Sequence, residues 1–185
     1  MIFTPTKIDG VFLVGLEPVA DERGSFARAW CADEFARHGL DATLAQCSFS
    51  YNREQGTVRG LHYQAPPHEE TKLVRVTCGA VFDVVVDLRP ASATYGEWIG
   101  VELSQSNHLA LYIPGGCAHG LQTLADHTEV LYQISTPYRA GAARGVRWND
   151  PTLAITWPLP VTCLSQRDRA WPDLALTPAS SLDGG

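Results

Sequence analysis

The stretch TVRGLHYQAPPHEETKLVRV, residues 57–76, places a histidine, an arginine and a lysine in or beside two strand-like apolar runs. His62 stands between Gly60 and Gln64 in the first run, and Lys72 opens the second. Charged residues on the solvent-facing side of a strand are ordinary. The stretch therefore indicates a site only if other segments point to the same residues.

The alternation of side chains along a strand gives a first expectation. Successive side chains point to opposite faces, so His62 and Gln64 share one face and Arg59 points to the other. A glycine inside a strand often marks a bulge, where one extra residue shifts the alternation. If Gly60 forms such a bulge, Arg59 turns toward the face of His62.

The composition predicts one globular domain over residues 1–185. The chain has 185 residues, of which 45% are hydrophobic, and its Pro-containing end, about 176–185, is typical of a poorly ordered tail. A net charge of −6 argues against binding to a nucleic acid polymer, which needs many basic contacts to phosphate. No apolar run approaches the roughly 20 residues that span a bilayer, and the first residues do not resemble a signal peptide. We expect a cytoplasmic protein with no membrane partner.

The cysteines indicate a reducing compartment. Five of them are scattered along the chain with no C-x-x-C pair, so the sequence favours neither a disulfide framework nor a zinc knuckle. We expect all five to be small buried hydrophobic residues.

Short apolar runs separated by Gly, Pro, Asn and Asp predict a mainly β protein, either a sandwich or a barrel. The expected strands are Val11–Leu16, Leu44–Tyr51, Thr57–Gln64, Lys72–Cys78, Ala80–Leu88, Trp98–Leu103, Leu109–Ile113, His119–Leu124 and Thr128–Ser135. One helix is expected in CADEFARHG, residues 31–39, with acidic residues early and Gly39 as its C-terminal stop.

Two segments resemble the signatures of the cupin superfamily. These are GTVRGLH, followed by Gln64 and Glu70, and PGGCAH further along. The resemblance implies a double-stranded β-helix (jelly-roll) barrel with the site in its mouth. Metal-binding cupins use His-x-His in the first segment, whereas the second histidine is Gln64 here, and an amide is a poor ligand for a transition metal. We expect no metal and no other cofactor.

A more specific resemblance covers almost the whole chain. The segments DERGSFAR, RGLHYQAPP, KLVRVTCGAVFDVVVDLRPASATYGEW, LYIPGGCAHGLQTL, EVLYQISTPY, GVRWNDP and LSQRDRAWP, in this order, resemble the dTDP-4-dehydrorhamnose 3,5-epimerase family. The resemblance implies a metal-free cupin barrel that epimerises a 4-keto-6-deoxy sugar carried on dTDP. It also implies a homodimer in which DERGSFAR of one chain reaches the nucleotide site of the other.

The chemistry of the residues fits that resemblance. Removing a hydrogen next to a ketone needs a positioned base and a group that stabilises the enolate oxygen, roles that suit His62 and Lys72. Tyr132 matches the family's catalytic tyrosine and is the expected acid on the opposite face. Asp168 matches the carboxylate partner of the histidine base, which orients the ring and stabilises the imidazolium.

The remaining candidates are substrate-binding residues. His119 and Asp83 are expected to form a second His–Asp pair that supports the site and the sugar hydroxyls. Arg59 and Arg23 suit the diphosphate, because guanidinium presents a planar fork to phosphate oxygens. Phe26 and Tyr138 match family positions that contact the nucleotide, and Gln46 matches a sugar-phosphate contact. The family often has Asn at the position of Ser48.

Three classes of function follow from the sequence. The leading one inverts C3 and C5 of dTDP-4-dehydro-6-deoxy-D-glucose to give dTDP-4-dehydro-L-rhamnose. The second is a C3-only epimerase or a 3,4-ketoisomerase on the same or a related dTDP-4-keto-6-deoxy sugar. The third is a sugar-nucleotide-binding cupin without chemistry, in which Lys72 and Tyr132 would have no task.

Overall fold

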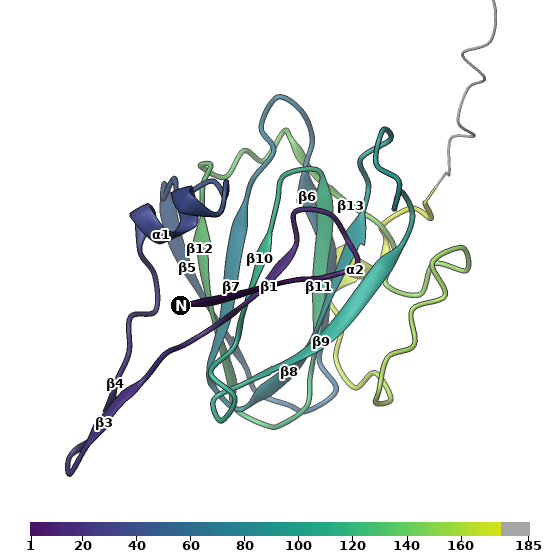
Figure 1. Ribbon diagram of the computed structural model, residues 1–185. Coiled ribbons are helices and arrows are strands. Elements are labelled where there is room, and N and C mark those ends of the chain that lie inside the picture. The colour runs from purple at the N-terminus through teal and green to yellow at the C-terminus, as the bar shows by residue number, and fades with distance from the viewer. Residues whose placement is uncertain (175–185) are drawn as a thin grey trace, which may run out of the picture.

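The computed structural model describes residues 1–174, which form two antiparallel sheets that face each other (Figure 1). The six-stranded sheet has the order β1 (Ile2–Pro5), β2 (Phe12–Gly15), β10 (Ala110–Ile113), β7 (Lys72–Cys78), β12 (Thr128–Ile134) and β5 (Gln46–Asn52). The five-stranded sheet has the order β13 (Ala143–Gly145), β6 (Val58–Gln64), β11 (Cys117–Thr123), β8 (Ala80–Asp87) and β9 (Trp98–Ser104). A ribbon of β3 (Val19–Asp21) and β4 (Gly24–Phe26) and the short helices α1 (Ala32–Arg37) and α2 (Gln166–Arg169) complete the described part of the chain. The arrangement confirms the predicted mainly β barrel of jelly-roll type.

The nine expected strands are all present, and their ends differ from the prediction by at most two residues. The expected helix is α1, and Gly39 follows it with a φ of 70°, which suits its predicted role as the C-terminal stop. The sequence analysis did not predict β1, β3, β4, β13 and α2. Each of these elements has only three or four residues, too few for a periodic pattern.

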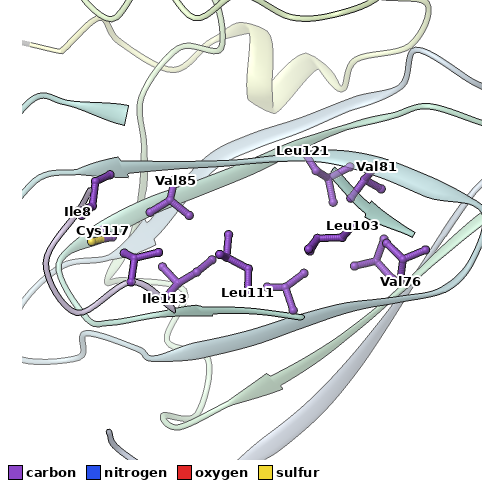
Figure 2. Packing of buried hydrophobic residues seen from close by; sticks show 12 residues of the cluster. Ile8, Val76, Val81, Val85, Leu103, Leu111, Ile113, Cys117 and Leu121 are labelled. Carbon is purple, nitrogen blue, oxygen red and sulfur yellow. The ribbon is translucent and has the colours of Figure 1, made fainter. Parts of the chain in front are cut away.

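A cluster of buried aliphatic side chains fills much of the space between the sheets (Figure 2). Val85 on β8 and Leu111 on β10 come from opposite sheets and are fully buried in it. Each such side chain contributes roughly 1.5–3 kcal/mol when it leaves water. Val84 and Val86, which alternate with Val85, are buried in a second cluster. Strand β8 is therefore apolar on both faces, which explains its continuous run VFDVVV.

The outer faces of the two sheets are also covered. Phe35 of α1 packs with Leu73 and Tyr112 of the six-stranded sheet. Residues that follow β13, among them Val146 and Leu153, pack with β6, β8 and β11. The polar side chains that turn into the barrel gather instead between β5, β7 and β12 on one side and β6 and β11 on the other, beside the apolar core.

The prediction that all five cysteines are buried was wrong for four of them, and of these Cys31 and Cys78 are partly buried. Cys117 is buried, and burial raises the pKa of its thiol to about 12. Cys47 and Cys163 are exposed. Cys47 lies on the edge strand β5, where alternation turns it away from the interior.

No helix within residues 1–174 is long and apolar enough to cross a membrane. The predicted tail at 176–185 lies outside the described residues. The assignment of residues 1–185 to a single domain stays a prediction.

Candidate active site

A cavity of about 460 Å³ opens between the two sheets. Its walls come from β5, β7 and β12 of the six-stranded sheet and from β6, β11 and β13 of the five-stranded sheet. Seven of the predicted site residues line it: Gln46, Arg59, His62, Lys72, His119, Tyr132 and Tyr138. Segments far apart in the sequence therefore converge on one site.

His62 and Asp168 form the predicted pair on the β6 wall. The Nε2 atom of His62 lies 2.7 Å from Oδ1 of Asp168, a residue of α2. Ser165 caps α2 by accepting a hydrogen bond from the Asp168 N–H, which fixes the carboxylate in place. Burial opposes ionisation of Asp168, but hydrogen bonds from His62 and the Gly60 N–H outweigh it and hold the pKa below its usual value. The carboxylate is therefore ionised at neutral pH and faces the imidazole.

The expected bulge lies at Gly60. On β11, His119 faces His62 and Leu121 faces Arg59, so β6 contains one extra residue between these two pairings. Gly60 has a φ of 126°, and a Cβ there would come within 2.5 Å of the Gly120 Cα. The bulge brings Arg59 to the same cavity as His62, as predicted.

Asn52 holds the Arg59 side chain in place. The Nε–H of Arg59 donates a 2.6 Å hydrogen bond to Oδ1 of Asn52. Asn52 is almost completely buried on β5. The guanidinium is thus fixed at its inner side while the residue remains exposed at the cavity.

The six-stranded sheet supplies the opposite wall. Lys72 lies at the start of β7, and its Nζ is 2.9 Å from Oε1 of Glu70, with both side chains nearly buried. Tyr132 lies on the neighbouring strand β12. Burial raises the pKa of Tyr132 well above its usual range, and the charge of Asp83 adds to this effect. The phenol therefore keeps its proton at neutral pH and can donate it.

The second predicted pair is also present. His119 Nε2 lies 2.8 Å from Oδ1 of Asp83, a fully buried residue of β8. The His119 ring lies 6.0 Å from the Tyr132 ring, centroid to centroid. The His119–Asp83 pair therefore lies beside Tyr132, the residue expected to be the acid.

Two predicted binding residues, Arg23 and Phe26, do not line this cavity. They lie on the β3–β4 ribbon, which extends away from the barrel (Figure 1). Phe26 is 79% exposed, and among the described residues Arg23 pairs only with Asp21 of the same ribbon. Within a single chain, the structure does not bring them to the other site residues.

The cavity wall also contains residues that were not predicted to belong to the site, although the sequence had drawn attention to two of them, Ser48 and Glu70. These wall residues are Ser48, Ser50, Tyr63, Glu70, Arg144 and Arg167. Glu70 stands two residues before Lys72, which is a signal for a charge pair. Arg167 directly precedes Asp168, and its guanidinium lies 5.2 Å from the ring centroid of Trp171. Within the segment LSQRDRAWP, only Asp168 was predicted to be a site residue.

The hydrogen bonds of Gln64 show how its amide is used at the position where metal-binding cupins have a ligand histidine. Its Nε2 donates to the carbonyl of His68 and its Oε1 accepts from the Arg139 N–H, so the amide is engaged with backbone groups. Within residues 1–174, no three His, Cys, Asp or Glu side chains are grouped so that they could hold a metal ion. The expectation of a metal-free reaction stays a prediction.

Comparison with known proteins shows the family to which the chain belongs. The family model for dTDP-4-dehydrorhamnose 3,5-epimerase matches residues 5–175. This chain belongs to the dTDP-4-dehydrorhamnose 3,5-epimerase family. A family member from Sinorhizobium fredii is 41% identical over 181 residues, which are 97% of this chain and 93% of that protein. A dTDP-4-dehydrorhamnose 3-epimerase from Streptomyces niveus is 39% identical and covers 100% of this chain and 87% of its own length.

A solved structure extends the comparison to the fold. The dTDP-4-dehydrorhamnose 3,5-epimerase from Bacillus anthracis, with TDP and PPi bound, superposes with a TM-score of 0.90 at 40% identity. The match covers 94% of this chain and 99% of that one. The predicted cupin barrel of the epimerase family is thereby confirmed.

Proposed function

We propose that this chain inverts C3 and C5 of dTDP-4-dehydro-6-deoxy-D-glucose to give dTDP-4-dehydro-L-rhamnose. The observation that carries the proposal is the placement of His62 and Tyr132 on opposite sheets, with the cavity between them. A base on one wall and an acid on the other can act on opposite faces of the same carbon. Inversion needs this arrangement.

Each epimerisation proceeds through an enolate. His62 takes the hydrogen next to the C4 ketone as a proton, and the electrons of the broken C–H bond pass to the C4 oxygen. Its Nε2 is bonded to Asp168, which leaves Nδ1 as the basic atom. Lys72 stabilises the negative oxygen, and Asp168 stabilises the imidazolium. Tyr132 then gives its phenolic proton to the carbon from the other face.

The rest of the substrate is assigned by charge and shape. Arg59 and Arg23 bind the diphosphate, and Tyr138 and Phe26 stack on the thymine. Gln46 contacts the sugar-phosphate part, and His119, held by Asp83, contacts the sugar hydroxyls. The β3–β4 ribbon does not reach the cavity of its own chain. Arg23 and Phe26 therefore act in the cavity of the partner chain of a homodimer. We place the reaction in the cytoplasm.

A C3-only epimerase is the second candidate, because the relative from Streptomyces niveus has that name at 39% identity. Incubation with dTDP-4-dehydro-6-deoxyglucose in deuterated water separates the two reactions. Deuterium at both C3 and C5, with an L-rhamno product, is expected. Exchange at C3 alone would assign the single epimerisation. A shift of the keto group would assign the ketoisomerase, and absence of exchange would leave a binding protein.

The Tyr132→Phe variant tests the assignment of the acid. It keeps the base and Lys72, so the enolate still forms, but reprotonation from the far face fails. Net epimerisation should fall by about 10²–10⁴-fold, the usual contribution of general acid catalysis. Solvent exchange with retained configuration should fall much less, because His62 can return a proton to the face it came from. Lys72→Ala should instead reduce exchange and epimerisation together. Equal loss of both in Tyr132→Phe would mean that the tyrosine only positions the substrate.

Turnover should not need a metal. Gln64 stands in place of the second histidine of a metal-binding cupin, and its amide is a poor ligand that is already hydrogen-bonded to backbone groups. We expect full activity after exhaustive dialysis against a chelator, measured with the same substrate. Activity that is lost on chelation and restored by Zn²⁺, Mn²⁺ or Fe²⁺ would contradict this.

A further inference from the structure

Gln64 occupies the position of a metal ligand in other cupins, yet within residues 1–174 each hydrogen bond of its amide is made to backbone. Its side chain is only 2% exposed at the end of β6. Nε2 donates to the carbonyl of His68 at 3.1 Å and to the carbonyl of Pro137 at 3.5 Å, and Oε1 accepts from the Arg139 N–H at 2.6 Å. One glutamine thus joins the loop that follows β6 to the loop that follows β12.

A second glutamine holds the same loop from the other sheet. Gln46, at the start of β5, accepts a hydrogen bond from the Tyr138 N–H at 3.1 Å. Two successive N–H groups, those of Tyr138 and Arg139, therefore donate to glutamines from opposite walls of the barrel. The backbone on both sides of Tyr138 is fixed, although its ring is not: Tyr138 is 54% exposed and lines the cavity.

An exposed aromatic side chain gains little from packing, so its position depends on how firmly its backbone is held. A loop that is free to move would lose conformational entropy when a ligand stacks on it, and this loss weakens binding. We infer that Gln64 is a positioning residue that, together with Gln46, fixes the loop of residues 135–142 so that Tyr138 is ready to stack on a nucleobase. The inference rests on the proposed function for its ligand, dTDP.

The test compares Gln64→Met with a matched control. Methionine keeps the length of the side chain and removes its three hydrogen bonds. Gln122 on β11 is the control, because it is fully buried and its amide makes two hydrogen bonds to the backbone of Leu159, which does not line the cavity. Gln122→Met should lower the melting temperature, as Gln64→Met should, and leave dTDP binding unchanged.

Three measurements decide the role of Gln64. In Gln64→Met, amide hydrogen exchange in residues 138–142 should accelerate, the Kd for dTDP should rise roughly five- to tenfold, the scale of one or two lost hydrogen bonds, and KM should change more than kcat. In a Tyr138→Ala background, Gln64→Met should cause no further loss of dTDP affinity, because it acts through Tyr138. Gln64→Leu removes the same three hydrogen bonds with an apolar side chain and serves if the methionine variant does not fold.

The inference is overturned if Gln64→Met binds dTDP as the wild type does, or if its loss of affinity persists in the Tyr138→Ala background. It is also overturned if the wild-type chain does not bind dTDP. A chain that binds dTDP but does not turn over the sugar nucleotide would overturn the proposed reaction alone. The binding readout therefore separates the two proposals.

Discussion

Among single residues, the nearly buried Lys72–Glu70 ion pair contributes little to the stability of the fold. Its presence is better explained by the reaction, which needs a fixed cation. Both side chains are nearly buried, and their charged atoms are 2.9 Å apart. Removing two charges from water costs free energy that the ion pair only partly returns, so such pairs are weak stabilisers. A site that must stabilise an enolate, in contrast, needs a fixed cation.

This reasoning predicts opposite outcomes for stability and activity. Lys72→Met leaves the Glu70 carboxylate buried without its counter-ion and should lower the free energy of unfolding by about 3 kcal/mol. The double variant Glu70→Gln/Lys72→Met removes both charges and should regain most of that loss. Neither variant should epimerise. Urea unfolding and a turnover assay check this, and a double variant as unstable as Lys72→Met would show that the pair holds the barrel together.

Some residues of the site could be predicted from the sequence and others could not. His62, Lys72 and Tyr132 were predictable because their residue types fit proton abstraction and their motifs resemble a family. Glu70 was not assigned a role, because whether a carboxylate two residues away bonds to a lysine depends on how the loop before β7 closes. That Gln64 binds no metal stays a prediction. Its partners His68, Pro137 and Arg139 were not predictable, because they come from two loops whose proximity is a tertiary feature.

Among the elements, short apolar runs bounded by turn residues predicted the strands, but strict alternation did not predict every side-chain direction. Arg59 reaches the cavity only because the bulge at Gly60 adds one residue between it and His62. A bulge could be predicted from the sequence, because a glycine inside a strand often marks one. Its cause lies on another strand, because the β6 backbone passes so close to Gly120 on β11 that a Cβ at Gly60 would not fit. Such an approach is fixed by strand pairing and is invisible in a single segment.

The turn between β8 and β9 depends on one buried carboxylate. Asp87 is fully buried and accepts hydrogen bonds from the side chains of Arg89, Ser92 and Thr94. Burial opposes its ionisation, but these hydrogen bonds outweigh that effect and hold its pKa well below the usual value. The ionised form therefore stabilises the fold above the ordinary aspartate pKa, and this contribution is lost as the pH falls through the lowered pKa.

We expect Asp87→Asn to lower the free energy of unfolding by about 3 kcal/mol at pH 7, the cost of breaking a buried ion pair. The difference from the wild type should shrink as the pH falls below the ordinary aspartate pKa, because Asp87 of the unfolded wild-type chain then takes up a proton while Asp87 of the folded chain stays ionised. Urea unfolding across that pH range measures both effects. Asp33→Asn, at an exposed position of α1, is the control. A difference that does not depend on pH would assign the loss to packing rather than charge.

At the scale of the whole molecule, the sequence predicted a two-sheet barrel, and the site follows from how the sheets face each other. Motifs placed His62 and Tyr132 in separate strands without telling which sheet each belongs to. The topology puts β6 and β12 in different sheets, and this places the base and the acid on opposite walls. Sheet membership depends on long-range strand pairing, which no local pattern of residues 57–76 or 128–134 contains.

The β3–β4 ribbon is the part of the molecule that one chain does not explain. Val19 is 73% exposed and Phe26 is 79% exposed on a ribbon that extends beyond the barrel (Figure 1). Two large apolar side chains on a projecting ribbon are unfavourable in water unless another surface covers them. The proposed homodimer supplies that surface and brings Arg23 and Phe26 to the partner's cavity.

Mixed dimers test whether the ribbon acts on the partner. A chain with Arg23→Ala/Phe26→Ala has a defective ribbon, and a chain with His62→Ala has a defective site; each should be inactive as a homodimer. If the ribbon serves the partner, their purified heterodimer contains one site with both an intact His62 and an intact ribbon, so about half of the wild-type activity should return, because a two-fold dimer has two equivalent sites. A heterodimer of the wild type with a chain that carries all three substitutions should be inactive, since each of its sites lacks one part. If the ribbon instead serves its own chain, the two results exchange: the first heterodimer is inactive and the second has half of the activity.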